Sequence, residues 1–202
     1  MKTQNTLNRA GLWGQIYPLI VQNQFKQALP VAAQLAEVFP EDPYALVSLS
    51  VCYSGTNQMN LAEAVLIDAY KRFPGHRAVP FHLAETQHRL RRFEQSEQTY
   101  RQALAATPAE YAGERSACYN GLGVVLLQQG KGDLALAMWQ EAVRRSPENV
   151  SARSHLDEFI RKYRDPSGPA SAFDDLSRFQ RFQTEKYLVG RGKKEFQSWE
   201  ER

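Results

Sequence analysis

Apolar and small residues recur along this chain in four copies of one pattern, and each copy ends at a proline. The four prolines, Pro40, Pro74, Pro108 and Pro147, are separated by 34, 34 and 39 residues. A spacing in the thirties is typical of helical repeat arrays, in which each unit buries its apolar face only against its neighbours. The pattern therefore predicts a stack of helix pairs, with one pair for each copy.

Small and large side chains occupy matching positions in the copies. The small ones are Ala28, Ser50, Ala62, Ala84, Ser96, Gly123 and Ala135, and the large ones are Leu66, Tyr100 and Trp139. Small side chains let the two helices of a pair approach closely, and large ones fill the space that remains. The prolines then stop the second helix of each pair.

The fourth copy resembles the tetratricopeptide repeat, a helix–turn–helix of ~34 residues. The residues that carry the resemblance are Tyr119, Leu122, Gly123, Leu126, Gly130, Ala135, Trp139, Ala142 and Pro147. The first copy departs from the family pattern, because Gln15 and Ile16 stand where the family has Leu-Gly. The resemblance implies an all-α, right-handed superhelical solenoid of four helix hairpins, followed by a C-terminal capping helix and a tail.

We expect the chain to divide along these lines. The expected parts are an N-terminal arm at 1–8, an array at 9–149 with repeats at about 9–42, 43–76, 77–115 and 116–149, a capping helix at 150–164, and a linker with a partly helical tail at 165–202. Asp42, which precedes Pro43, reads as a helix N-cap. Asn149 has the same role before the capping helix, which would cover the open end of the last repeat. The alternative is that this helix binds a partner.

Five extra residues separate the third and fourth copies. Thr107 and Glu110 have the spacing of a capping box, which predicts a helix over 108–129 that is longer than its siblings unless Gly113 breaks it. The regular superhelix should be perturbed here. The five extra residues are either a tolerated loop insertion or an insertion with a function.

The tail after the linker at 165–169 carries aromatic and apolar residues at roughly helical spacing. They are Phe173, Leu176, Phe179, Phe182 and Tyr187. A disordered tail usually has fewer aromatic residues. We therefore expect a helix over 172–189 that docks on its own array or on a partner, with plain disorder as a third possibility.

The resemblance also implies which residues face the concave groove, because the first helices of the pairs line it in this family. Projected on this register, they are Trp13, Tyr17, Tyr44, Val47, Val51, Phe81, His82, Glu85, Arg89, Asn120 and Val124. Exposed aromatic residues usually mark an interaction site. The alternative is that Trp13 and Phe81 pack between adjacent helices.

Chaperone-binding members of the family hold a C-terminal carboxylate with a clamp of Lys, Asn, Asn, Lys and Arg. The matching positions here are Trp13, Tyr17, Ser48, Ala78 and His82, and none of them fits. This argues against binding to the acidic tails of heat-shock chaperones. An apolar groove favours a helical or extended apolar segment of another protein.

Charge and cysteine content indicate which targets and which cellular location to expect. The net charge is +3 with interspersed signs, and the chain has no basic stripe, which argues against a nucleic-acid target. No apolar run approaches the ~20 residues that cross a bilayer. Cys52 and Cys118 are single and flanked by apolar residues, as reduced packing residues would be. We expect a cytoplasmic protein without membrane insertion.

Catalytic and metal chemistry finds no support in the sequence. His76, His82 and His88 step by six residues, so they point about 120° apart on a helix, and no metal-binding motif accompanies them. Gly121-x-Gly123 and Gly130-Lys131-Gly132 lack the strand and the Ser/Thr of a phosphate loop. We expect no enzyme activity and no cofactor.

The leading hypothesis is a non-catalytic protein-interaction module that acts as an adaptor, assembly factor or chaperone through an aromatic concave groove. The alternative is a structural subunit of a larger complex, such as a secretion or multi-enzyme assembly.

Overall fold

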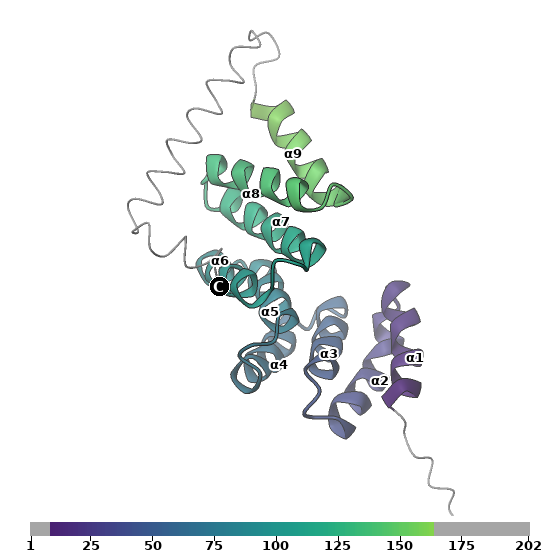
Figure 1. Ribbon diagram of the computed structural model, residues 1–202. Helices are drawn as coiled ribbons and strands as arrows, with labels where there is room; N and C mark the ends of the chain where they lie inside the picture. Colours follow the sequence, from purple (N-terminus) through teal and green to yellow (C-terminus); the bar gives the residue numbers. More distant parts are fainter. Residues whose placement is uncertain (1–8, 164–202) are drawn as a thin grey trace, which may run out of the picture. The chain divides into compact units, whose positions relative to one another are not determined.

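The computed structural model describes residues 9–163, and this part of the chain is built from helices alone (Figure 1). The helices are α1 (Arg9–Val21), α2 (Phe25–Val38), α3 (Pro43–Gly55), α4 (Met59–Arg72), α5 (Ala78–Arg89), α6 (Phe93–Ala106), α7 (Ala112–Gln128), α8 (Gly132–Arg145) and α9 (Val150–Tyr163). They belong to two compact units, Met1–Arg92 and Phe93–Arg202, which are described separately. Within each unit, a helix packs mainly against the next one along the chain.

The prediction that proline ends each second helix is confirmed. Helices α2, α4, α6 and α8 end at Val38, Arg72, Ala106 and Arg145, and a proline lies two residues beyond each end. A proline cannot donate a backbone hydrogen bond, and it disfavours the helical conformation of the residue before it. The chain therefore leaves the helix at the same point of every repeat.

A second periodic feature lies in the turn between the two helices of each pair, and sequence reasoning did not identify it. One residue in each turn has a positive φ: Asn23 (57°), Asn57 (63°), Arg91 (61°) and Gly130 (74°). Their spacings are 34, 34 and 39 residues, the same as those of the prolines. After each of them, the next backbone N–H returns to the preceding helix, as Lys131 N–H does to the Leu126 carbonyl at 2.9 Å. This is the Schellman ending, which satisfies the last carbonyls of a helix.

The core positions inferred from the repeat pattern are confirmed. All seven small residues are buried, and so are Leu66 in the first unit and Tyr100 and Trp139 in the second. Trp139 on α8 is 1% exposed and lies against Gly123 on α7, where a Cβ would come within 2.6 Å of the indole nitrogen. A glycine at position 123 is what allows this close approach.

Both expected N-caps are present. The Asp42 side chain accepts a hydrogen bond from the Tyr44 N–H at 3.0 Å, and Pro43 is the first residue of α3. Asn149 accepts one from the Ala152 N–H at 3.0 Å at the start of α9. In each case a side-chain oxygen satisfies one of the amide groups that a helix leaves unpaired at its beginning.

The expected capping box at Thr107 is wrong. The Thr107 hydroxyl donates to the Ala103 carbonyl at 2.7 Å, so this residue closes the end of α6 instead of opening α7. Helix α7 begins at Ala112 and not at residue 108, and Gly113 lies inside it without breaking it. The connection between α6 and α7 is no longer than the one between α4 and α5, whereas α7 has 17 residues and α1, α3 and α5 have 12 or 13. The extra residues therefore lie in α7, which confirms the expectation of a helix longer than its siblings.

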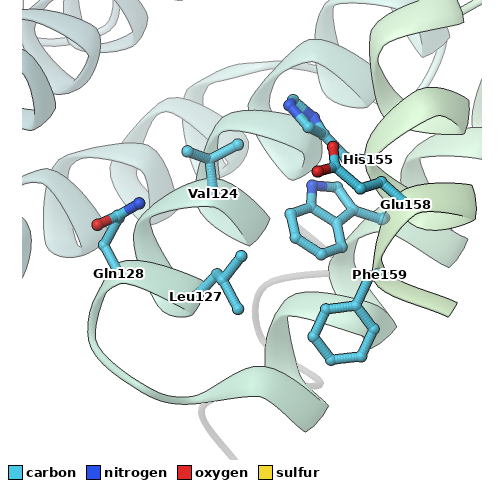
Figure 2. A pocket seen from close by; sticks show the side chains of 7 residues that line it. Val124, Leu127, Gln128, His155, Glu158 and Phe159 are labelled. Atoms are coloured by element: carbon cyan, nitrogen blue, oxygen red, sulfur yellow. The ribbon is translucent and has the colours of Figure 1, made fainter. Parts of the chain in front are cut away.

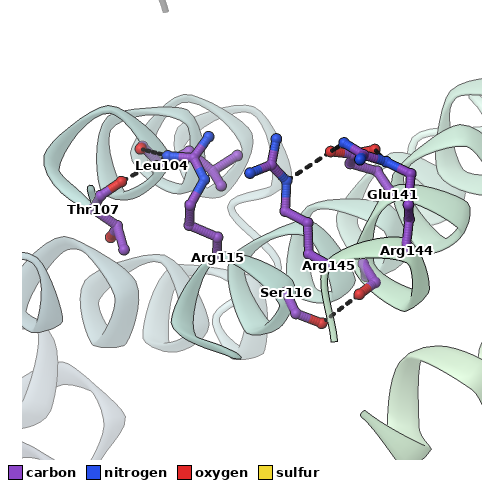
Figure 3. A network of polar contacts seen from close by, with 8 residues as sticks. Leu104, Thr107, Arg115, Ser116, Glu141, Arg144 and Arg145 are labelled. Carbon is purple, nitrogen blue, oxygen red and sulfur yellow. Dashed lines mark hydrogen bonds and ion pairs between the residues drawn. The ribbon is translucent and has the colours of Figure 1, made fainter. Parts of the chain in front are cut away.

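A buried arginine holds this connection in place (Figure 3). Arg115 on α7 donates from Nη1 to the carbonyls of Leu104 and Thr107, at 2.9 and 2.6 Å. Next to it, Ser116 donates to the Ala142 carbonyl at 2.7 Å and so ties α7 to the end of α8. Side chains of α7 thus satisfy carbonyls at the ends of α6 and α8.

Candidate functional site

The first helices of the pairs in the first unit are α1, α3 and α5, and polar contacts join them. Arg9 at the start of α1 forms an ion pair with Asp42 at 2.6 Å, just before α3. Arg89 on α5 donates to the Ser54 hydroxyl on α3 at 2.6 Å. We call the surface formed by Trp13, Tyr17, Tyr44, Phe81, His82, Glu85 and Arg89 of these helices the N-terminal face.

Two tyrosines are the most exposed aromatic residues of the N-terminal face. Tyr17 on α1 is 67% exposed and Tyr44 on α3 is 38% exposed. Trp13 and Phe81 are half-buried, and Trp13 packs against the core of the unit. The face therefore has an aromatic base with two phenol rings that are accessible to solvent.

Short contacts orient the polar side chains of this face. His82 Nδ1 lies 3.0 Å from Glu85 Oε2, and the His82 ring meets the edge of the Phe81 ring with centroids 5.1 Å apart. Tyr44 packs edge-on against His76 at 4.6 Å. The Arg89 guanidinium is exposed apart from its bond to Ser54, so it offers further donors to a ligand.

Val47 does not belong to an exposed surface, contrary to the expectation from the family register. Its side chain is buried in the core of the first unit, with 7% of its surface exposed, and Val51 is half-buried. The physical reason is that α3 is apolar around most of its circumference, because it packs against α2, α4 and α5. A helix that is apolar on all sides leaves little of its surface to a ligand.

Asn120 lies in the second unit, where both of its oxygen atoms already have partners. Its backbone carbonyl accepts the Trp139 indole N–H at 3.3 Å, and its side-chain oxygen lies 2.8 Å from His155 Nδ1 on α9. The capping helix therefore occupies the position at which this asparagine would have met a partner.

A shallow pocket of about 210 Å³ opens beside this contact, between α7, α8 and α9 (Figure 2). We call it the α7–α9 pocket, and its lining residues are Val124, Leu127, Gln128, Trp139, His155, Glu158 and Phe159. In Figure 2 the labelled side chains of α7 lie across from those of α9. Small-molecule sites typically measure ~300–1,000 Å³, so this pocket has the size for one or two side chains of a peptide.

The floor of the α7–α9 pocket is apolar and one part of its rim is acidic. Trp139 stacks on His155 with ring centroids 5.5 Å apart, and it meets the Phe159 ring at 5.8 Å. Glu158 is exposed at the rim. The sequence identified Val124 as a groove residue and Phe159 as part of the apolar side of this helix, but it did not indicate His155, and it favoured a capping role for α9 over a binding role. The spacing of four residues between His155 and Phe159 places both on one helical face and could have revealed the site.

Residues 9–163 contain no cluster of three His, Cys, Asp or Glu side chains that could hold a metal ion. None of the described helices is long and apolar enough to cross a membrane. The tail residues expected to dock, namely Phe173, Leu176, Phe179, Phe182 and Tyr187, lie outside the described residues.

Comparison with known proteins gives a family and a fold. The family model described as tetratricopeptide repeat matches residues 53–111 and 120–156. No curated protein sequence matches the chain significantly.

Among solved structures, three similar ones illustrate the fold. A thermophilic tetratricopeptide protein from Thermus thermophilus has a TM-score of 0.68 at 19% identity, covering 78% of this chain and 84% of its own. PilF of Pseudomonas aeruginosa has a TM-score of 0.68 at 18% identity, with coverages of 90% and 92%. The first tetratricopeptide domain of Spaghetti (RPAP3), bound to an HSP90 peptide, has a TM-score of 0.54 at 17% identity, with coverages of 60% and 92%.

Proposed function

The chain belongs to the tetratricopeptide repeat family, and from this premise we propose that it is a non-catalytic adaptor, assembly factor or chaperone in the cytoplasm. Its ligand is a helical or extended apolar segment of another protein, which binds the N-terminal face. The observation that carries this proposal is the exposure of Tyr17 and Tyr44, at 67% and 38%, on neighbouring first helices of one unit.

Tyrosine suits a recognition surface because it adds a large contact area and has few rotatable bonds to immobilise. Buried tyrosine and arginine anchors often cost ~2 kcal/mol or more when they are truncated in an interface. Trp13 lies one helical turn before Tyr17 on α1, and Phe81 on α5 is half-buried, so the proposed ligand would contact aromatic residues of α1, α3 and α5. Arg89 at the α5 end would bond to polar groups of the ligand backbone.

Binding to the acidic tails of heat-shock chaperones is not part of this proposal. The positions that correspond to the carboxylate clamp carry Trp13, Tyr17, Ser48, Ala78 and His82. Of these, Ser48 is buried and donates its hydroxyl to the Tyr44 carbonyl of its own helix at 2.7 Å. It is therefore unable to hold a ligand carboxylate.

A matched pair of variants tests the site. Partners are first identified by affinity purification and mass spectrometry, and their binding to the purified full chain is then measured. We expect the Tyr17→Ala/Tyr44→Ala variant to weaken binding at least tenfold, or ~1.4 kcal/mol. The Leu61→Ala/Ile67→Ala variant removes exposed apolar side chains of α4, which are 47% and 38% exposed, and should leave binding unchanged. Equal affinities for the two variants would exclude the N-terminal face as the site.

One observation favours the second candidate, a structural subunit of a larger assembly. This observation is the apolar character of α1, which has no charged residue after Arg9. Val21 at its end is 61% exposed, and a Cβ at Gly11 or Gly14 would meet nothing within 4 Å. End repeats of soluble arrays usually present a polar outer face. Solubility that requires co-expression with a partner would support the subunit, and a well-behaved monomer on gel filtration would support the adaptor.

A further inference from the structure

We propose that the aromatic segment 172–189 of the same chain docks in the α7–α9 pocket, with Phe179 and Phe182 as its anchors. The pocket, α9 and the segment all belong to the second unit. The inference is independent of the partner site on the N-terminal face, because it involves none of the residues of that face.

The shape of the α7–α9 pocket fits an aromatic side chain. Val124 and Leu127 lie on one side of the pocket and Phe159 on the other (Figure 2), and Trp139 also lines it. The Phe159 ring is itself held in place, because it lies against the start of α8, where a Cβ on Gly132 would be 3.3 Å from it. A preformed apolar slot loses little entropy when a ring enters it, which favours even a small contact area.

The two arginines beside the anchor phenylalanines complement the acidic part of the pocket rim. Glu158 is exposed at the rim, and Asp157 next to it on α9 is exposed as well. In the segment, each of the two phenylalanines directly follows an arginine, in the sequence Arg178-Phe179-Gln180-Arg181-Phe182. A ring in the slot thus brings a guanidinium near a carboxylate.

The length of chain beyond α9 allows the segment to return to the pocket. Helix α9 ends at Tyr163, and Phe159 of the pocket lies four residues before this end. Fifteen residues lie between Tyr163 and Phe179, and an extended chain of this length spans up to ~55 Å. Tethering gives the segment an effective concentration on the order of millimolar, so a weak contact suffices for occupancy.

Disulfide trapping in the full chain tests this contact without removing the anchors. One variant carries Gln128→Cys at the rim together with Gln180→Cys between the two phenylalanines. Its control carries Gln128→Cys with Gln197→Cys, which lies outside the segment. We expect the first pair to form an intrachain disulfide at least ~10-fold faster in a glutathione buffer, because the docked segment raises the local thiol concentration. The native cysteines are both buried and do not compete.

Further substitutions in the trapping variant separate docking from chance collision. Adding Phe179→Ala and Phe182→Ala should lower the trapping rate to that of the control. Glu158→Lys should slow trapping, and adding Arg178→Glu and Arg181→Glu to it should restore the rate. Equal rates for the two cysteine pairs, or a rate that is insensitive to the phenylalanines, would overturn the proposal. A covalent dimer as the main product would overturn it too, because the segment would then dock on a second copy.

Discussion

The close packing of Trp139 on Gly123 leads to a prediction with an internal control in the same helix. Both Gly113 and Gly123 lie in α7, but a Cβ at Gly113 meets nothing within 4 Å, whereas one at Gly123 would lie 2.6 Å from the Trp139 indole nitrogen. We therefore expect Gly113→Ala and Gly123→Ala to change stability in opposite directions.

The magnitudes follow from two competing terms. Alanine near the start of a helix stabilises the protein by ~0.5 kcal/mol relative to glycine, because the unfolded chain loses freedom. At Gly123 the helical preference contributes up to ~1 kcal/mol. Overpacking against a ring that is 1% exposed costs ~1–3 kcal/mol. The indole bond to the Asn120 carbonyl at 3.3 Å is worth a further ~1 kcal/mol if the ring has to shift. The expected net loss is ~1–3 kcal/mol.

Thermal unfolding followed by circular dichroism measures the difference. At ~2–4 °C per kcal/mol for a chain of this size, Gly113→Ala should raise Tm by ~1–2 °C and Gly123→Ala should lower it by ~5 °C. Far-ultraviolet spectra of the two variants before heating should match that of the original protein. A Tm for Gly123→Ala that is equal to or above that of Gly113→Ala would refute the packing argument.

Three further predictions rest on single side chains. Arg91→Gly should raise Tm by ~2–4 °C, because a positive φ costs a non-glycine residue ~1 kcal/mol. An unchanged or lower Tm would show that other contacts of the arginine outweigh this strain. Burial alone would raise the pKa of Glu97, but bonds from Lys131 and Arg101 lower it to about 2. Its contribution to stability should therefore be complete above about pH 4.5 and disappear as the pH falls toward about 2. In denaturant titrations the gap between the original protein and Glu97→Gln should close over that window, and a gap independent of pH would contradict this. Burial raises the pKa of the Cys52 thiol to about 11. In a variant without the other cysteine, a thiol reagent at pH 8 should therefore label Cys52 ~100-fold more slowly in the folded than in the unfolded protein. Similar labelling rates in the two states would contradict the burial of Cys52.

The sequence predicted the fold well where the effect of a residue depends on its own backbone conformation or on the size of its side chain. Proline positions, the N-cap at Asp42 and the buried Trp139 follow from rules that hold for one residue and its immediate neighbours. The periodic repetition of these signals reduced the chance of error, because each copy tested the others.

The failures come from contacts that the local sequence pattern does not specify. Thr107 has the spacing of a cap, yet its hydroxyl donates to the Ala103 carbonyl of the preceding helix. Arg115 from the next helix then binds two further carbonyls at this end of α6. Val47 is buried because α3 packs against three other helices. The alignment of the repeats does not reveal how many helices surround α3. The α7–α9 pocket combines side chains of three helices, so it became visible only when the helices were placed together.

The packing of each helix mainly against its successor has a kinetic consequence. Contacts between neighbours in sequence close only short loops, and chains of low contact order fold quickly. Such arrays can also lose a terminal pair while the interior stays ordered, because no distant strand holds the end. Within the first unit, amide hydrogens of α1, which packs mainly against α2, should therefore exchange with solvent sooner than those of α3, which packs against α2, α4 and α5.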